Sequence, residues 1–184
     1  IIGDFIGNKV AVYGGAIYND GVIGNIIGDF IGNKAAAYGG AIYNDKDGSI
    51  GNITGDFINN ETGVIINYGS IGNITGDFIK NYTDSYGSIY NNEKGTIGNI
   101  TGDFIGNWSY YLVGAIANSG TIGNITGDFI GNYALDSGGA IYNDSSSTSS
   151  TIDNITGDFI GNCVSSNSSP SRGGAIYNGK NGII

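Results

Sequence analysis

The chain has 184 residues, of which 35 are glycine and none is histidine or methionine, and its formal net charge is −9. Its seven Lys and Arg residues are scattered, which argues against a surface for nucleic acid or an anionic membrane. The lack of histidine excludes Ser-His-Asp and Cys-His catalysis and His-ligated metals. No apolar run approaches the roughly 18 residues of a membrane span, so we expect no transmembrane segment in this stretch.

Seven copies of Gly-Asp-Phe-Ile organise the chain. Their aromatic residues are all the phenylalanines of the protein and recur every 21 to 30 residues: Phe5, Phe30, Phe57, Phe78, Phe104, Phe129 and Phe159. A repeat of this length indicates a solenoid of stacked coils. We therefore expect residues 1–184 to form a single β-helix segment of seven repeats of about 25 residues, truncated in mid-repeat at both ends.

Each repeat contains, in chain order, three short Ile-rich segments bounded by Gly and Asn. In the second repeat these segments are 23–26, 28–31 and 41–44. They are typical of strands, and the dense glycine disfavours helices. Length varies only after Asn33, after Asn44 and at their equivalents, as expected of loops. The sequence predicts an all-β fold, a single-stranded right-handed parallel β-helix with three short strands per coil and about seven coils.

Five apolar columns are predicted to fill the interior, represented in one coil by Ile23, Ile26, Phe30, Ile31 and Ile42. Each buried side chain contributes roughly 1.5–3 kcal/mol, so contacts between coils should be the main source of stability. Because Ile31 directly follows Phe30, either the chain bends there or Ile31 forms an exposed stripe. We expect the bend.

Three asparagine columns mark the predicted corners of each coil, beginning at Asn25, Asn8 and Asn19. The amide of one coil can hydrogen-bond the amide of the next and form an asparagine ladder. The ladder predicted from the second column comprises Asn33, Asn60, Asn81, Asn107, Asn132 and Asn162. The alternative is glycosylation, since Asn52-Ile-Thr54 and its equivalents match the acceptor motif. We favour the ladder because laddered asparagines are expected to be hidden.

One aspartate per coil forms a further column, comprising Asp4, Asp29, Asp56, Asp77, Asp103, Asp128 and Asp158. Carboxylates about 4.8 Å apart repel, so something must offset their charge. Backbone N–H groups can do so, and Ca²⁺ bound between carboxylates, helped by Thr54 and its equivalents, is the alternative. We favour the backbone and expect no cofactor, with calcium at Asp29 to Asp158 as the alternative.

A tyrosine column is predicted to face outward: Tyr18, Tyr43, Tyr90, Tyr142 and Tyr177. Stacking between coils is the favoured interpretation, and a strip that grips glycans or partner proteins is the other. Ala117 and Ile66 interrupt the strip. The Ser-rich segments 144–151 and 164–171 are expected to be solvated loops. The loop 163–172, which begins at an inert Cys163, is the expected place for a specific contact.

Two motifs, Gly39-Gly40-Ala41-Ile42 and Phe30-Ile31-Gly32-Asn33, resemble the polymorphic outer-membrane-protein repeat of chlamydial surface proteins and autotransporter passengers. The resemblance covers essentially the whole chain. It implies a non-enzymatic structural or adhesive module, a stalk or fibre at the bacterial cell surface. Open ends with exposed strands favour end-to-end self-association with further coils. A host-cell glycan or protein receptor is the other expected partner.

Two other functions fit a β-helix. Polysaccharide lyases and hydrolases concentrate carboxylates at one place, whereas here the aspartates are copied in every coil. Ice-binding β-helices use flat threonine arrays, and Thr96, Thr121 and Thr151 align, but other residues take their place in earlier coils. We rank both functions behind the surface module.

Overall fold

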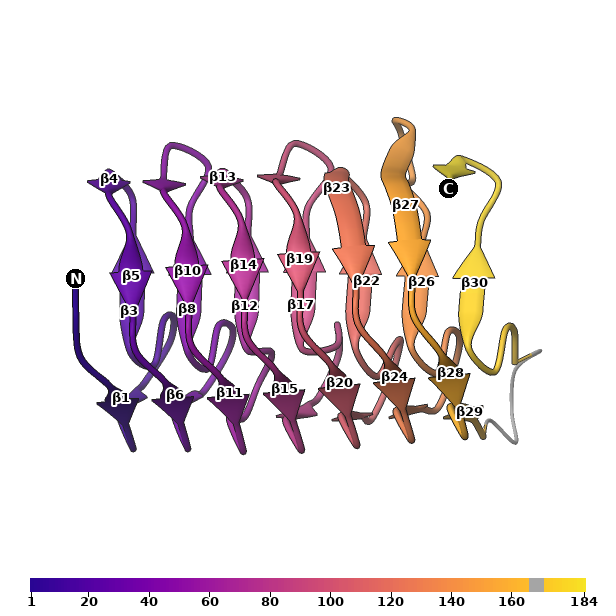
Figure 1. Ribbon diagram of the computed structural model, residues 1–184, viewed down its shortest axis with the longest axis horizontal. Helices are drawn as coiled ribbons and strands as arrows, with labels where there is room; N and C mark the ends of the chain where they lie inside the picture. The colour runs from indigo at the N-terminus through magenta and orange to yellow at the C-terminus, as the bar shows by residue number, and fades with distance from the viewer. Residues whose placement is uncertain (166–170) are drawn as a thin grey trace.

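The computed structural model describes residues 1–165 and 171–184 and shows a β-solenoid whose coils succeed one another along one long axis (Figure 1). The described residues contain strands and no helix, and the named strands pair in parallel. The predicted all-β fold is confirmed, with about six turns close to the seven predicted coils.

One face of the solenoid is the Phe sheet, a file of seven two-residue strands. Equivalent residues pair with one another, so that Phe57 lies between Phe30 and Phe78. The strands are β1 (Phe5–Ile6), β6 (Phe30–Ile31), β11 (Phe57–Ile58), β15 (Phe78–Ile79), β20 (Phe104–Ile105), β24 (Phe129–Ile130) and β28 (Phe159–Ile160).

A second face, the Thr sheet, begins as two parallel files that merge in the later coils. One file contains β4 (Val22–Ile23), β9 (Ser49–Ile50), β13 (Ser70–Ile71) and β18 (Thr96–Ile97). The other contains β5 (Ile26–Ile27), β10 (Ile53–Thr54), β14 (Ile74–Thr75) and β19 (Ile100–Thr101). They join in β23 (Thr121–Thr126) and β27 (Ser150–Thr156), and β31 (Gly182–Ile183) pairs with β27. The predicted strand 23–26 is thus two strands in the early coils.

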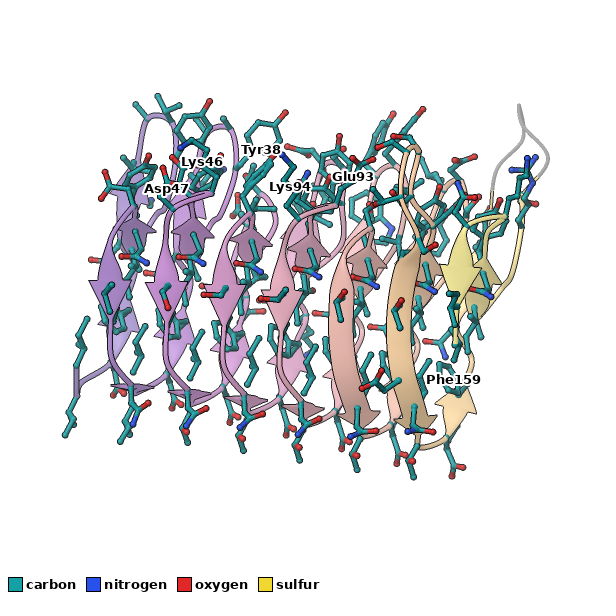
Figure 2. All side chains as sticks on the ribbon, turned by 90° about the horizontal axis from the view of Figure 1, so that it is seen from above. Tyr38, Lys46, Asp47, Glu93, Lys94 and Phe159 are labelled. Carbon is teal, nitrogen blue, oxygen red and sulfur yellow. The ribbon has the colours of Figure 1, made fainter. Side chains whose placement is uncertain are left out.

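The third face, the Tyr sheet, contains the strands predicted at 41–44 and its equivalents. They are β3 (Ile17–Asn19), β8 (Ile42–Asn44), β12 (Ile65–Asn67), β17 (Ile89–Asn91), β22 (Ile116–Asn118), β26 (Ile141–Asn143) and β30 (Ile176–Asn178). Loops that follow these strands carry Lys46, Asp47, Glu93 and Lys94 along one side of the solenoid (Figure 2).

The structure adds a fourth, short strand position between the Phe and Tyr sheets. It is formed by β2 (Lys9–Val10) and β7 (Lys34–Ala35) in the first coils and by β16 (Tyr82–Thr83), β21 (Trp108–Ser109), β25 (Tyr133–Ala134) and β29 (Cys163–Val164) later. Lys, Tyr, Trp and Cys occupy one register position there, so comparison of the repeats does not reveal a strand.

Four of the five predicted apolar columns fill the interior. In the central coils Ile74, Phe78 and Ile89 are 0 % exposed. The bend predicted after Phe30 is wrong, because Phe30 and Ile31 are successive residues of one strand and point to opposite faces. Ile31 is therefore half-buried on the outside. A small-residue column missed by the sequence analysis is fully buried instead, at Ala41, Val64, Ala115 and Ala140.

From the second coil onward, the glycine of the Gly-Asp pair is required by the stacking. Gly102 has a φ of 145°, which side chains with a Cβ rarely adopt. A Cβ at this position would lie only 2.0 Å from the backbone oxygen of Gly76 in the preceding coil. The close approach of backbones at this corner therefore explains why glycine recurs there.

Candidate functional site

The structural ladders run through the interior. Phenylalanine rings of successive coils stack with centroids 4.5–4.9 Å apart and planes within 8° of parallel. In the second asparagine column, Asn81 Nδ2 donates to Asn107 Oδ1 at 3.0 Å and to the Phe57 carbonyl oxygen at 2.8 Å. Both asparagines are buried. The asparagine ladder predicted at this corner is confirmed.

The asparagine column on the Thr sheet differs from the buried ladders. Asn52, Asn73, Asn99 and Asn124 are exposed. Asn99 Oδ1 nevertheless accepts hydrogen bonds from the backbone N–H of Asn124 at 2.9 Å and from its Nδ2 at 3.1 Å. The expectation that laddered asparagines are hidden is therefore wrong for this column, which carries the Asn-Ile-Thr motif. In the later coils, Asn99 and Asn124 and the exposed threonines Thr101 and Thr126 line an open polar groove of about 510 Å³.

The aspartate column lies in the turn between the Thr and Phe sheets. Oδ1 of each aspartate accepts a hydrogen bond from the backbone N–H of the next aspartate, as in the 2.8 Å contact from Asp77 N to Asp56 Oδ1. The same contact joins Asp29 to Asp4, Asp56 to Asp29, Asp103 to Asp77, Asp128 to Asp103 and Asp158 to Asp128. In residues 1–165 and 171–184, no three His, Cys, Asp or Glu side chains gather around a metal position. Calcium on this column stays a prediction.

Tyrosines on the outer face of the Tyr sheet form a stacked strip with two breaks. Tyr18 stacks on Tyr43 at 5.5 Å, and Tyr142 stacks on Tyr177 at 5.0 Å. At the first break, Ile66 is covered, and Tyr68 contacts both neighbouring tyrosines at 5.6 Å and 6.2 Å. The first break is therefore closed by another aromatic ring.

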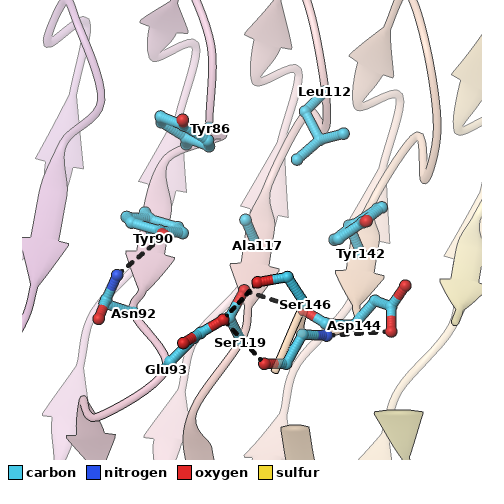
Figure 3. Close-up of a pocket in the computed structure, with 11 residues that line it drawn as sticks. Tyr86, Tyr90, Asn92, Glu93, Leu112, Ala117, Ser119, Tyr142, Asp144 and Ser146 are labelled. Carbon is cyan, nitrogen blue, oxygen red and sulfur yellow. Dashed lines mark hydrogen bonds between the residues drawn. The ribbon is translucent and has the colours of Figure 1, made fainter. Parts of the chain in front are cut away.

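The second break opens a cleft. Ala117 pairs with Tyr90 on one side and with Tyr142 on the other, so a methyl group occupies the tyrosine position. The cleft has a volume of about 430 Å³, which lies within the roughly 300–1,000 Å³ of small-ligand sites. Figure 3 shows Tyr90, Ala117 and Tyr142 in a row, with Tyr86 and Leu112 on one side of the row. This aromatic cleft is the candidate functional site.

Carboxylates line the other side of the cleft, where Figure 3 shows Glu93 and Asp144. Glu93 Oε1 accepts hydrogen bonds from Ser145 Oγ at 3.2 Å and Ser146 Oγ at 2.7 Å, and Oε2 accepts one from Ser147 Oγ at 2.7 Å. These bonds, above all the one from Ser147, lower the pKa of Glu93. The Glu93 carboxylate is consequently ionised at neutral pH and fixed in place.

Asp144 is fixed in a similar way, because its Oδ1 accepts the backbone N–H groups of Ser145 at 3.0 Å and Asn181 at 3.1 Å. The aromatic side stays uncharged, since burial raises the pKa of both Tyr90 and Tyr142. No Lys or Arg is among the described residues that line the cleft. The site thus combines neutral aromatic rings with two negative charges that lack a basic partner there.

The sequence analysis missed this site, although both of its signals are visible. From the sequence alone, Ala117 only interrupts the tyrosine strip, and the Ser-rich segment 144–151 is predicted to be a solvated loop. Ser145 is instead only 5 % exposed and bonds Glu93, 52 residues earlier. For the other expected contact loop, 163–172, Cys163 is exposed, and residues 166–170 lie outside the described part.

Comparison with known proteins gives one family. Residues 4–20, 29–45, 126–144 and 149–179 match the family model of the Chlamydia polymorphic membrane protein repeat. These four segments are similar to polymorphic membrane protein repeats. The predicted resemblance is thereby confirmed in these four segments, which leave out the central coils at 46–125 with both breaks of the tyrosine strip. Searches of curated proteins and of solved structures found no match. In the part of the chain that the structure describes, no helix could span a membrane.

Proposed function

We propose that the chain is a non-enzymatic module at an extracellular bacterial surface, in which the stacked coils form a stalk and the Tyr sheet makes adhesive contacts. The observation that carries the proposal is the match to a membrane-protein repeat on a solenoid with tyrosines on an outer face. Exposed aromatic strips of this kind supply contact area at low entropic cost. Host-cell glycans or proteins are the partners in this proposal.

The surface location is tested by labelling intact cells of the source organism with an antibody against the chain. Labelling before permeabilisation supports the proposal, and labelling only afterwards contradicts it. Adhesion is tested with beads that carry the purified chain and cultured epithelial cells. We expect Tyr18→Ser combined with Tyr177→Ser to reduce bead binding, whereas Thr101→Ser combined with Thr126→Ser, on the Thr sheet, should leave it unchanged.

Association with further coils, end to end, belongs to the same proposal. Parallel strands of a solenoid offer unpaired N–H and C=O groups at an edge, where another coil can add. Electron microscopy of the native product should show fibres whose width is that of one solenoid. Compact single particles at all concentrations would count against a stalk.

A polysaccharide lyase or hydrolase is the main alternative. A hydrolase of this type needs one carboxyl group with a raised pKa to act as general acid. The Glu93 pKa is lowered by its serine hydrogen bonds, which favours a binding role over an acid. Loss of viscosity when the chain is incubated with polysaccharides would support the enzyme instead.

Ice binding is the second alternative, and the observation that favours it is the exposed threonine array of the Thr sheet. Thr101, Thr126 and Thr156 are exposed in register, beside the exposed asparagines. Thermal hysteresis in a freezing assay would support ice binding, and its absence would leave the Thr sheet as a plain outer face.

A further inference from the structure

The cleft over Ala117 exists because two departures from the repeat coincide. Alanine replaces tyrosine in β22, and the long segment after β26 folds back over two coils to reach Glu93. The adjoining break at Ile66 has neither feature and leaves a space of only about 20 Å³. The volume over Ala117 therefore follows from these two departures and is not a general property of the coils.

The charges of the cleft select the charge of its ligand. Glu93 and Asp144 line the side of the cleft opposite Tyr86 and Leu112 (Figure 3). Lys94, the residue after Glu93 in the sequence, is exposed and does not line the cleft. The two ion pairs found among the described residues, Lys34 with Glu61 and Lys46 with Asp47, lie elsewhere. An anionic ligand would be repelled, whereas a cation gains from both carboxylates.

The hydrogen bonds select the kind of cation. The two oxygens of Glu93 already accept three serine hydroxyls, and Asp144 Oδ1 accepts two backbone N–H groups. The Glu93 carboxylate thus offers charge more than free hydrogen-bond acceptors, whereas Asp144 keeps its Oδ2 open on the described residues. A quaternary ammonium group needs charge and aromatic faces but has no N–H to donate, and rings such as Tyr90 and Tyr142 attract it through cation–π interactions.

From these observations we infer that the cleft over Ala117 binds a quaternary ammonium group of the choline type. The inference deepens the proposed adhesive function and rests on it for its biological meaning, because it names the chemistry of a group on the contacted surface. Tyr142 and the stacked pair of Tyr86 and Tyr90, whose ring centroids are 4.5 Å apart, supply the aromatic surfaces. Glu93 and Asp144 supply the charge, and Ala117 provides the room.

The test is calorimetric titration of the purified chain with choline and with its neutral isostere 3,3-dimethylbutan-1-ol. Cation–π and carboxylate attraction should make choline bind about 5- to 30-fold more tightly than the isostere. Equal binding of the two compounds, or no binding of choline, overturns the inference. Choline binding without adhesion of beads to cells would count against the proposed function alone.

Three variants locate the binding. Ala117→Tyr fills the cleft with the residue that other coils carry and should abolish choline binding while the circular dichroism stays that of a β-solenoid. Glu93→Gln keeps the shape but removes the charge and should weaken binding at least about fivefold. Glu61→Gln makes the same change outside the cleft and should leave choline binding unaltered. Equal weakening by both Glu variants, or full binding by Ala117→Tyr, overturns the inference.

Discussion

The Phe sheet and the Tyr sheet are built from the same number of strands but tolerate change differently. All seven residues of the inward phenylalanine column are identical and stack at nearly constant spacing. The outward tyrosine column has lost its aromatic ring at Ile66 and Ala117, and one of these losses created a cleft. An inward side chain is confined by the coils on both sides, whereas an outward one has solvent as a neighbour. New binding chemistry can therefore arise on the Tyr sheet without loss of the fold.

The largest expected effect comes from breaking the inward column. Phe78→Ala should lower the free energy of unfolding by about 3–5 kcal/mol, because it leaves a cavity between two stacked rings. Tyr142→Ala, its outward counterpart, should cost clearly less because its ring is only half-buried. Urea denaturation of both variants measures the difference. Equal losses would refute the contrast between the two sheets.

The same contrast is expected between the buried and the exposed asparagine ladder. Asn107→Ala should cost about 3 kcal/mol, since each buried group left without a partner costs about 1–3 kcal/mol. The groups left are the backbone N–H of Asn81 and one N–H of its side-chain amide, both of which donate to Asn107 Oδ1. Asn99→Ala, in the exposed column, should cost under about 1 kcal/mol because water replaces the lost bonds. Thermal unfolding of the pair provides the measurement, and similar melting temperatures would contradict the prediction.

The sequence predicted the inward columns well because identical residues must stack when coils stack. Phe30 and Asn33 could be assigned to ladders by comparing the repeats alone. The position of Ile31 could not, because a two-residue strand is too short to reveal its own alternation. The cleft could not be predicted either. Its geometry depends on how the segment after β26 folds back to Glu93, and that conformation follows from loop packing instead of a repeated pattern.

A smaller effect on stability is expected at high pH, where Tyr43 on the Tyr sheet begins to ionise. Burial, followed by the nearby Asp45 charge, raises the pKa of Tyr43 to about 12 from an ordinary value of 10.0. The folded state thus favours the neutral phenol. Its contribution to stability is complete below pH 10 and is lost as the pH rises from 10 to about 12. The urea midpoint of the unchanged protein should fall as the pH rises over this range. The urea midpoint of Tyr43→Phe should fall less steeply. An unchanged slope in the variant would contradict the assignment.

The smallest expected effect concerns the aspartate column. Because Asp56 Oδ1 already accepts a backbone N–H from Asp77, we expect excess EDTA to leave the melting temperature unchanged. Differential scanning calorimetry with and without EDTA, and with added CaCl₂, makes the measurement. A large drop in EDTA that CaCl₂ reverses would establish calcium between these carboxylates.

Residues 1–20 and 26–45 differ only at Val10/Ala35 and Val12/Ala37, and their strands pair residue for residue. Deletion of residues 21–45 would join Asp20 to Lys46 and recreate the native Asp45–Lys46 junction. Recombination between such copies can therefore remove or add a whole coil without leaving an unmatched ladder. The length of the solenoid is set by a copy number, which a genome can change in one step while the ladders stay in register.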